Sequence, residues 1–489
     1  MKKFERIGLI SLLVLAGLFV LSFFYVSLMR INYPYELEWM EGGILQEIEQ
    51  ILSGGKLYVE PSLTFIPYIY GPVYFHVAAV FSYLFGENIF SMRLVSFLAT
   101  IGIFVLLFLT IKKETNNHKA AFLTVGLFTA TYSLSGYWFD LARVDMLFMF
   151  LLLAGIYCVR FFENKWMWIL GSTLLVLSIF TKQTSMFVVG AFLLALFIKN
   201  KKKGIIAGAL TGLLGAIGII VMNVVYGKWY IYYLFELPKH HELQPRMSVN
   251  FWIGDIGILF VLFGLVVHVL WKMKKEKNED FIHYLFLFVS MFFISWSSRV
   301  HSGGYVNVVI PAYYILALVG GYTIHYAKHH VTIRPFTIYG LLIFQFLFLM
   351  FNPMRPFKPW EHIPNTNQTK NIQTIKKEID KTKGNIFAPS FSYLTENKQV
   401  QAMALVDIYR AKGNVEKKQI LEKELQQNIK KQKYQKLILT SGDMKWIEVI
   451  VPELNHYYQR TEKRKIPESY TVDGALSHSY SIYVPKKER

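Results

Sequence analysis

The chain has 489 residues, of which 53% are hydrophobic and 17% charged, and its net charge is +19. An ordinary soluble domain carries about a quarter charged residues, and here the deficit is concentrated in apolar runs such as 7–24, 94–111 and 147–161. Runs of about twenty apolar residues are typical of membrane spans. The composition therefore excludes a soluble enzyme and a disordered chain.

The positive charge is distributed as in a membrane protein and not as in a nucleic-acid-binding protein. The segment 353–489 holds 25 Lys and Arg against 15 Asp and Glu, and contributes +10. Most of the remaining excess lies in short clusters between apolar runs, around residues 2–6, 112–119, 199–203 and 272–277. Such clusters mark the cytoplasmic loops of membrane proteins. We therefore predict a lipid bilayer as the environment and no nucleic acid partner.

The same clusters assign a direction to each expected span. The first apolar run follows a basic start and lacks a small-residue cleavage site, so we expect a retained span with a cytoplasmic N-terminus. With residues 112–119 inside, a single external loop at 30–91 precedes them, and its short apolar stretch 73–85 is expected to be a juxtamembrane or re-entrant helix. About eleven spans are expected, near residues 8–29, 92–111, 119–136, 145–162, 166–181, 184–198, 204–226, 253–271, 281–297, 305–326 and 336–352.

The chain changes character after residue 352, which divides it into a membrane domain at 1–352 and a soluble domain at 353–489. Because the number of spans is odd, the soluble domain is expected outside the cytoplasm, on the side of the first external loop. Its helix and strand signals alternate, with an amphipathic stretch at 369–381, a β-like run at 385–389, a charged helix at 415–433 and a β-like run at 436–440. The alternation predicts a small α/β domain.

Charged groups are costly inside a membrane, so their positions in the chain are informative. The first candidate for chemistry is the acidic stretch after the first span, which contains Glu36, Glu38 and Glu41. In a helix, Glu38 and Glu41 would lie on one face. The alternative interpretation is a solvated acidic turn on a helix at the membrane surface.

A second set of charged residues is expected on the same side of the membrane. Asp140, Arg143 and Asp145 stand between an outward and an inward span, and the alternative is an Asp–Arg pair at a helix end. Lys182, between two apolar runs, would be costly unless it reached water or an anion, and Arg93 is similar unless it only extends toward water. Carboxylates can act as a general base or hold a divalent cation, and cations can neutralise a phosphate leaving group. The combination suggests group transfer from a phosphorylated lipid.

Short motifs follow one another in order over residues 1–350. They are ELEWMEG at 36–42, SGGKLY at 53–58, YGPVYF at 70–75, FG at 85–86, MRL at 92–94, RVD at 143–145, TKQT at 181–184, GGY at 303–305 and IPA at 310–312. This set resembles the GT-C glycosyltransferases, specifically the bacterial relatives of the protein O-mannosyltransferases and of the lipid A aminoarabinose transferase. The resemblance implies a polytopic helical fold and a polyprenyl phosphate sugar as the donor.

The resemblance also implies roles for the acidic residues. It implies a catalytic base in the first external loop, which matches Glu38, with Glu36 and Glu41 as rivals. It implies a second acidic residue before the fourth span, which matches Asp145, with Asp140 nearby. Which of the three glutamates is the base stays open.

The same resemblance suggests roles for the basic residues and bears on whether a metal ion is needed. Arg93, Arg143 and Lys182 become candidate contacts of the donor phosphate. Members of the family differ in metal dependence, so no cofactor is certain and a divalent cation, Mg or Mn, is a candidate. A single cysteine, Cys158, lies in an apolar run and excludes a thiolate metal site.

The external loop between the seventh and eighth spans carries two histidines. His240 and His241 precede a glutamate, with Arg246 close by, and Arg299 and His301 are expected on the same side. Adjacent residues do not converge on one helical face as the histidines of a zinc HExxH motif do. We therefore favour substrate contacts or a solvated loop over a zinc site.

The predicted function is that of a plasma-membrane glycosyltransferase with an inverting mechanism. It would move a sugar from a polyprenyl-phosphate donor to a hydroxyl of an envelope glycan, lipid or protein on the extracytoplasmic face. The alternative is a non-enzymatic transporter or flippase of a lipid-linked sugar intermediate. A transporter would favour gating Gly or Pro breaks and internal repeats, and neither is evident in the sequence.

Overall fold

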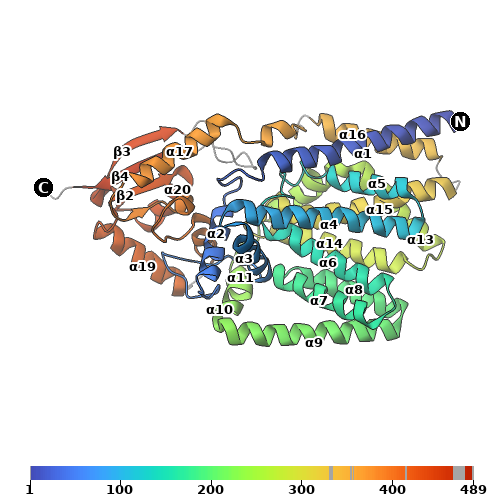
Figure 1. The fold of residues 1–489 in the computed structure, drawn as a ribbon, viewed down its shortest axis with the longest axis horizontal. Coiled ribbons are helices and arrows are strands. Elements are labelled where there is room, and N and C mark those ends of the chain that lie inside the picture. The colour runs from blue at the N-terminus through green and yellow to red at the C-terminus, as the bar shows by residue number, and fades with distance from the viewer. Residues whose placement is uncertain are drawn as a thin grey trace.

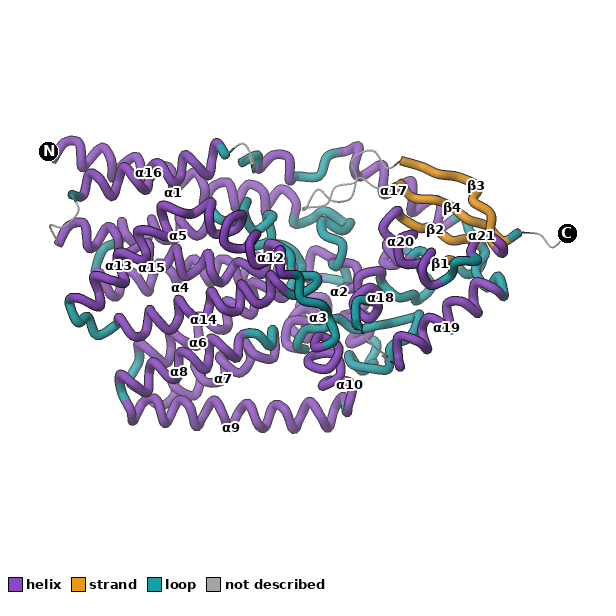
Figure 2. Tube along the Cα trace, turned by 180° about the vertical axis from the view of Figure 1, so that it is seen from behind, coloured by secondary structure: helices purple, strands orange, loops and turns teal. Residues whose placement is uncertain are grey.

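The computed structural model describes residues 2–329, 334–352, 355, 357–412, 416–465 and 479–486. Long helices lie side by side along the long axis of the molecule, and a small sheet lies at one end (Figure 1). The N-terminus lies at the opposite end of the helices from the sheet, as the view from behind also shows (Figure 2). The part of the chain expected outside the cytoplasm is therefore gathered at one end of the molecule.

Helices form at all eleven segments expected to span the membrane. They are α1 (Lys2–Arg30), α4 (Ile89–Thr115), α5 (His118–Thr129), α6 (Val144–Phe161), α7 (Lys165–Thr181), α8 (Ser185–Lys199), α9 (Lys201–Tyr226), α13 (Phe260–Lys275), α14 (Phe281–Val300), α15 (Ile310–His329) and α16 (Pro335–Phe351). The two largest departures from the expected ranges are at α5, which ends at Thr129 and not near 136, and at α13, which begins only after a π-helical and a 3₁₀ turn over 251–259.

Length and apolar composition decide which of these helices can cross a membrane. Among the described residues, seven helical stretches satisfy both criteria, over 3–30, 89–115, 144–161, 201–226, 245–275, 281–300 and 306–326. The helices α7, α8 and α16 are apolar but shorter. α7 and α8 are short because residues 182–184, which include Lys182, are not helical and separate the two helices. A polytopic membrane protein is therefore supported, and the count of eleven spans stays a prediction.

Small residues allow the helices to approach closely. A Cβ atom on Gly155 of α6 would lie 2.9 Å from the carbonyl oxygen of Gly171 on α7, and a Cβ on Gly126 of α5 would lie 2.3 Å from the Cβ of Ala16 on α1. Helices in a bilayer associate through such close backbone packing because lipid offers no hydrophobic driving force. These contacts bring α6 against α7 and α5 against α1.

The loop between α1 and α4 contains two helices, α2 (Glu41–Leu52) and α3 (Val73–Phe85). The second forms at the short apolar stretch that was expected to be helical, and Pro72 precedes its first residue. Further short helices connect α9 to α13, namely α10 (Lys228–Ile231), α11 (Leu237–Lys239) and α12 (Pro245–Asn250).

The C-terminal part forms a four-stranded sheet in the order β1-β2-β4-β3. Its strands are β1 (Ile386–Phe387), β2 (Lys436–Thr440), β3 (Tyr458–Lys465) and β4 (Ser479–Pro485), and its helices are α17 (Thr366–Asp380), α18 (Ala402–Tyr409), α19 (Glu416–Lys430), α20 (Ser441–Ile450) and α21 (Leu454–Tyr457). The pair β1–β2 is parallel and the other pairs are antiparallel. The start of the expected charged helix, Val415, lies outside the described residues.

Alternation along β2 explains why helices cover both faces of this sheet. Ile438 packs in a cluster with Ile375 and Ile379 of α17, whereas Leu437 and Leu439 belong to the cluster that includes residues of α19. Successive side chains of a strand point to opposite faces. The mixture of helices and strands predicted for this part of the chain is therefore present.

Candidate active site

A buried ion pair joins the loop between α1 and α4 to the start of α6. Arg143 Nη1 lies 3.1 Å from each carboxylate oxygen of Glu38, and Arg143 Nη2 donates to the Tyr70 hydroxyl at 3.0 Å. The Glu38 side chain is fully buried and that of Arg143 is 3% exposed. Two buried charges are stabilised only when they are paired and hydrogen-bonded. Arg143 therefore links the carboxylate of Glu38 to the hydroxyl of Tyr70.

A second ion pair lies in the first turn of α6. Lys182 Nζ is 2.6 Å from Asp145 Oδ1, while Trp138 Nε1 and Asn307 Nδ2 donate to Asp145 Oδ2 at 3.2 and 3.0 Å. Both charged side chains are buried. The sequence predicted that Lys182 needs water or an anion nearby. The structure supplies an anion, which is the carboxylate of Asp145.

One short segment supplies half of each pair. Arg143 precedes α6 in an extended conformation, with φ −138° and ψ 155°, and Asp145 lies in the first helical turn. A carboxylate is favoured there because a helix N-terminus carries partial positive charge. The charges of Arg143 and Asp145 also act on each other. The motif at 143–145 thus couples Glu38 to Lys182.

Glu41 and Arg93 form a separate pair. Arg93 Nε and Nη2 lie 2.9 and 2.6 Å from the two Glu41 oxygens, which also accept from the backbone N–H groups of Ala142 (2.9 Å) and Leu37 (2.7 Å). Burial raises the pKa of Glu41, but the charge and hydrogen bonds of Arg93 outweigh this and hold the pKa below its usual value. Both side chains have 0% exposure. The pair fastens the loop to α4.

Asp140 pairs with an arginine of the first helix and not with Arg143. Arg30 Nε and Nη2 lie 2.8 and 2.6 Å from the Asp140 oxygens, the Tyr132 hydroxyl donates to Asp140, and Arg30 Nη2 donates to the carbonyl of Tyr137 at 2.6 Å. Arg30 and Asp140 are fully buried. An Asp–Arg pair was one of the two interpretations of this segment, and the structure supplies a different arginine.

Glu36, the third glutamate of this loop, accepts a hydrogen bond from within the loop. Its Oε1 accepts from the backbone N–H of Gly42 at 2.8 Å. Burial, together with the charges of Glu38 and Glu41, raises the pKa of Glu36 well above its usual range. A general base must be ionised at the working pH. This counts against Glu36 as the base.

The difference between Glu41 and Glu36 leads to a stability prediction. Glu41→Gln leaves Arg93 charged and buried without a counter-ion, which costs about 3–5 kcal/mol. Glu36→Gln keeps an oxygen that accepts from Gly42 and is expected to cost about 1 kcal/mol or less. Thermal unfolding of the purified variants in detergent, compared at pH 7.5, measures both. A Glu41→Gln protein that unfolds at the wild-type temperature would contradict a structural role for the pair.

The histidines lie beside the C-terminal segment. His241 Nε2 is 2.7 Å from the carbonyl oxygen of Asp407, His301 Nε2 is 3.0 Å from that of Pro238, and the two rings are 5.2 Å apart. Burial lowers the pKa of His241 to about 4, so its ring is neutral at physiological pH. His240 is exposed. The loop at 240–243 is thus held by backbone contacts on both sides.

The two arginines of this group differ. Arg246 is exposed, whereas Arg299 Nε lies 2.8 Å from Asp255 Oδ2 and its Nη1 donates to the carbonyl of Gly304 at 2.8 Å. Arg355 also approaches Asp255, at 3.2 Å. Arg299 therefore stabilises the C-terminal end of α14, and the structure does not bring it to the pairs on α6.

Comparisons with known proteins are consistent with this architecture. Residues 69–227 match the family model described as dolichyl-phosphate-mannose-protein mannosyltransferase. The structure aligns with ArnT from Cupriavidus metallidurans bound to undecaprenyl phosphate, with a TM-score of 0.59, 9% identity and coverage of 96% of this chain and 97% of that one. The apo state of that ArnT gives the same TM-score and coverage at 11% identity. No curated protein sequence matches this chain.

A third structure shares the architecture over part of its length. It is the oligosaccharyltransferase of Archaeoglobus fulgidus in complex with Zn and sulfate, with a TM-score of 0.51, 9% identity and coverage of 91% of this chain and 71% of that one. Both proteins are GT-C glycosyltransferases. The chain has the GT-C glycosyltransferase fold. The resemblance seen in the order of the sequence motifs is thereby confirmed.

The GT-C fold here carries site residues that sequence reasoning missed. Tyr70 lies in the motif at 70–75, and Asn307 lies shortly after the motif at 303–305. The motifs therefore pointed to these segments but did not indicate the roles of the two residues. Gln401 and Asp407, from the C-terminal part, had no signal. The Tyr68 hydroxyl donates to Gln401 Oε1 at 3.0 Å, and Gln401 Nε2 donates to a backbone carbonyl of the acidic loop.

Asp407 places a further carboxyl group near the Glu38–Arg143 pair. It lies in α18, 3.6 Å from Arg410 Nη1, and the charge of Arg143 acts on it. Burial raises the pKa of Asp407 to about 6, although both arginines oppose this. The C-terminal part of the chain therefore lies against the acidic loop and contributes its own charged groups.

The residues that the structure describes do not fit a divalent-cation site. Within those ranges, no three His, Cys, Asp or Glu side chains gather into a group that would hold a metal. Glu38 and Asp145 are each engaged by a side-chain cation. Mg or Mn was a candidate from the sequence, and no step of the chemistry below is assigned to a metal.

Proposed function

We propose that this chain is an inverting glycosyltransferase that moves a sugar from a polyprenyl-phosphate donor to a hydroxyl of an envelope glycan, lipid or protein. The observation that carries the proposal is the arrangement of two coupled acid–cation pairs, Glu38–Arg143 and Asp145–Lys182, at the end of the bundle where the C-terminal part lies. The undecaprenyl phosphate bound by the structurally similar ArnT supports a polyprenyl donor.

In the proposed reaction, Glu38 is the general base. Its carboxylate takes the proton of the acceptor hydroxyl, whose oxygen forms a bond to the anomeric carbon from the face opposite the phosphate. The bond between that carbon and the phosphate oxygen breaks, and the polyprenyl phosphate departs with the electron pair. The attack from the opposite face inverts the anomeric configuration.

The cations serve the leaving group. Arg143 and Lys182 are held by Glu38 and Asp145 in the absence of substrate. A phosphate that binds these cations competes with the carboxylates, so donor binding frees Glu38 to accept a proton. As the phosphate gains negative charge, both cations stabilise it more strongly, which lowers the barrier. Asp145, fixed by Trp138 and Asn307, keeps Lys182 in place.

The remaining candidates take positioning roles in this proposal. Glu41, Arg93 and Asp140 fix the backbone around the site, as their buried pairs indicate. His240 and Arg246 are exposed on the loop beside the C-terminal segment and are available to an acceptor.

The experiment that tests the function supplies the purified chain with defined donors. Synthetic polyprenyl-phosphate sugars with hexose or pentose groups are incubated with it, and mass spectrometry follows the release of polyprenyl phosphate. Envelope glycans of a deletion strain identify the acceptor. Transferase activity predicts release of polyprenyl phosphate and loss of one glycan modification. Movement of intact donor across proteoliposomes without release would favour a transporter or flippase and overturn the proposal.

The proposed orientation places the N-terminus in the cytoplasm and residues 353–489 outside the plasma membrane. Ser441 and Asn116 are both exposed. Ser441 is the first residue of α20 in the C-terminal part, and Asn116 directly follows α4. In a Cys158→Ala background, a cysteine at Ser441 is expected to react with an impermeant maleimide in intact cells, and one at Asn116 only after permeabilisation. Reaction at Asn116 in intact cells would reverse the orientation.

A further inference from the structure

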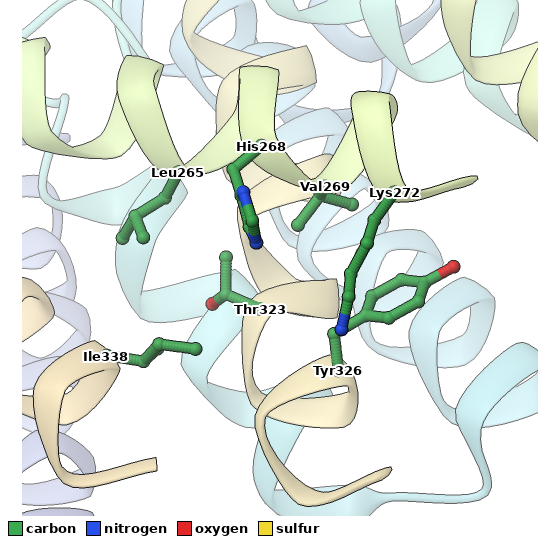
Figure 3. A pocket seen from close by; sticks show the side chains of 7 residues that line it. All are labelled: Leu265, His268, Val269, Lys272, Thr323, Tyr326 and Ile338. Atoms are coloured by element: carbon green, nitrogen blue, oxygen red, sulfur yellow. The ribbon is translucent and has the colours of Figure 1, made fainter. Parts of the chain in front are cut away.

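A groove lies where the C-terminal part meets the segment that follows α9. Its lining consists of Lys228, Trp229 and Ile231 of α10, Tyr232 and Glu236 of the π-helical turn that follows, and Glu416 and Lys417 of α19. Its volume is about 480 Å³, within the range of small-molecule sites. The pocket between α13, α15 and α16 (Figure 3) offers only about 10 Å³, the space of about one water. The groove is therefore large enough for a sugar unit, and that pocket is not.

Two aromatic rings meet close to a right angle in the groove. The ring centroids of Trp229 and Tyr232 are 5.5 Å apart, and the two ring planes enclose 87°. The Nζ atoms of Lys228 and Lys417 lie 5.0 and 5.6 Å from the centroid of the Trp229 ring. The electron-rich face of an aromatic ring attracts cations and polarised C–H groups alike. Because Lys228 is exposed, its ammonium can give way to the C–H face of a ligand at little cost.

The charged groups of the groove balance one another. Its lining contains two lysines and two glutamates. Lys417 pairs with Glu60, and Glu236 pairs with Lys239 at 2.7 Å, so these partners preserve the balance. Such a lining favours neither a net anion nor a net cation, but it supplies both donors and acceptors of hydrogen bonds. Sugar hydroxyls both donate and accept, and the lining therefore matches a neutral saccharide.

One helical turn joins the groove to the proposed active site. Gln183, which follows Lys182, donates from Nε2 to the carbonyl oxygens of Ile69 at 3.0 Å and Leu234 at 3.2 Å. Ile69 precedes Tyr70, and Leu234 belongs to the π-helical turn that also lines the groove. Such π-helical turns inside helices are frequent at functional sites. The wall of the groove is therefore hydrogen-bonded to the segment that carries Lys182, which in turn holds the segment of Tyr70.

We propose that the groove binds a neutral sugar unit of the acceptor, which makes the acceptor a saccharide and not a protein. The C–H face of the sugar packs on Trp229, its hydroxyls donate to Glu236 and Glu416, and Lys228 donates to a hydroxyl oxygen. This assignment rests on the proposed function. In the proposed orientation the groove lies on the side of the membrane where envelope glycans are found.

An anionic lipid headgroup is the alternative occupant of the groove. Its phosphate would be attracted by Lys228 and Lys417, but the carboxylates of Glu236 and Glu416 line the same groove and would repel it. Aromatic residues at a membrane surface can also serve only as anchors, yet one wall of the groove belongs to α19 of the C-terminal part. A saccharide is therefore the occupant that uses the aromatic rings and both kinds of charge.

The test measures saccharide binding to the full-length chain in phosphatidylcholine nanodiscs, because maltoside detergents carry a sugar of their own. Saturation-transfer NMR, titrated with maltotriose and with triacetylchitotriose, gives the Kd of each saccharide. The matched control for Trp229→Leu is Trp360→Leu, which removes an exposed tryptophan of the C-terminal part. The wild type and Trp360→Leu are expected to bind at least one of the saccharides. Trp229→Leu is expected to bind it about tenfold more weakly, the loss of one aromatic contact.

A second pair of variants keeps the test open should Trp229→Leu fail to fold. Glu416 is exposed, so its replacement leaves the packing of α19 in place. Glu416→Ala is expected to weaken saccharide binding, whereas Glu416→Gln retains an oxygen that accepts from a sugar hydroxyl and is expected to bind as the wild type does.

The saccharide assignment is overturned if neither saccharide binds the wild type, or if Trp229→Leu and Trp360→Leu bind equally well. It is also overturned if glycerol 3-phosphate or trialanine binds in their place and depends on Trp229, which would assign the groove to a lipid headgroup or a peptide. In transfer assays, Trp229→Leu is expected to raise the acceptor KM about tenfold and to keep kcat, and an unchanged KM would separate the groove from the acceptor. Binding requires no donor, so a chain that binds saccharide but transfers no sugar would refute the proposed function and not the sugar site.

Discussion

Glu38→Gln is expected to reduce sugar transfer by about 10²–10⁴-fold, the range that general-base catalysis contributes. Glutamine keeps the size of the side chain and one hydrogen-bond acceptor for Arg143, but it cannot take a proton from the acceptor hydroxyl. Single-turnover transfer by the purified variant, with donor binding measured separately, tests this. Donor binding should be retained, because a neutral side chain at residue 38 releases Arg143 to the phosphate.

Glu36→Gln is the matched control for this variant. Glu36 is in the same loop, but burial raises the pKa of its carboxyl well above the usual range, which disfavours the ionised form that a general base needs. Its variant should transfer sugar at close to the wild-type rate. A dead Glu36→Gln beside an active Glu38→Gln would move the base to Glu36. Full activity in both, with Glu41→Gln also active, would sink the mechanism.

The sequence predicted the helices well because the membrane imposes a strong signal on each of them. A run of apolar residues long enough to span a bilayer leaves little choice of structure, and the lysine clusters between such runs separate one helix from the next. The short helix at 73–85 was also found, because Pro72 and its apolar composition define it locally. Local composition was sufficient wherever one segment determined its own structure.

Ion pairs between residues that are distant in the chain could not be predicted from the sequence. Five acids looked alike as candidates, yet Asp140 pairs with Arg30 and Glu41 with Arg93. These partners are 110 and 52 residues apart. Asp145 is close to Arg143 in sequence, yet it pairs with Lys182. Only the packing of the helices determines which acid meets which cation, and this distinguishes a buried structural pair from a site residue.

The C-terminal part shows the same limit. Its helices and strands were predicted from alternating local signals, but the order β1-β2-β4-β3 brings the last strand between two earlier ones. The contacts of Gln401 with the acidic loop join residues more than 330 positions apart. Nothing local in α18 indicates that it lies against a loop that follows the first helix.

Lys182→Met is expected to lower the rate of transfer by about 10²–10³-fold, which is the usual cost of removing one group that stabilises developing charge. The single variant alone is ambiguous, because it leaves Asp145 buried without its cation, and an unpaired buried charge destabilises a protein by several kcal/mol. A loss of activity could then follow from misfolding.

The double variant Lys182→Met/Asp145→Asn separates the two explanations, because it removes both charges and leaves no unpaired ion. Trp138 and Asn307 can still hydrogen-bond to the asparagine oxygen that replaces Asp145 Oδ2. If Lys182 stabilises the departing phosphate, the double variant recovers the thermal stability lost in the single variant but remains at least about a hundredfold slower than the wild type. Recovery of both stability and transfer would show that Lys182 only neutralises Asp145. Of the two proposed cations, Arg143 alone would then stabilise the departing phosphate.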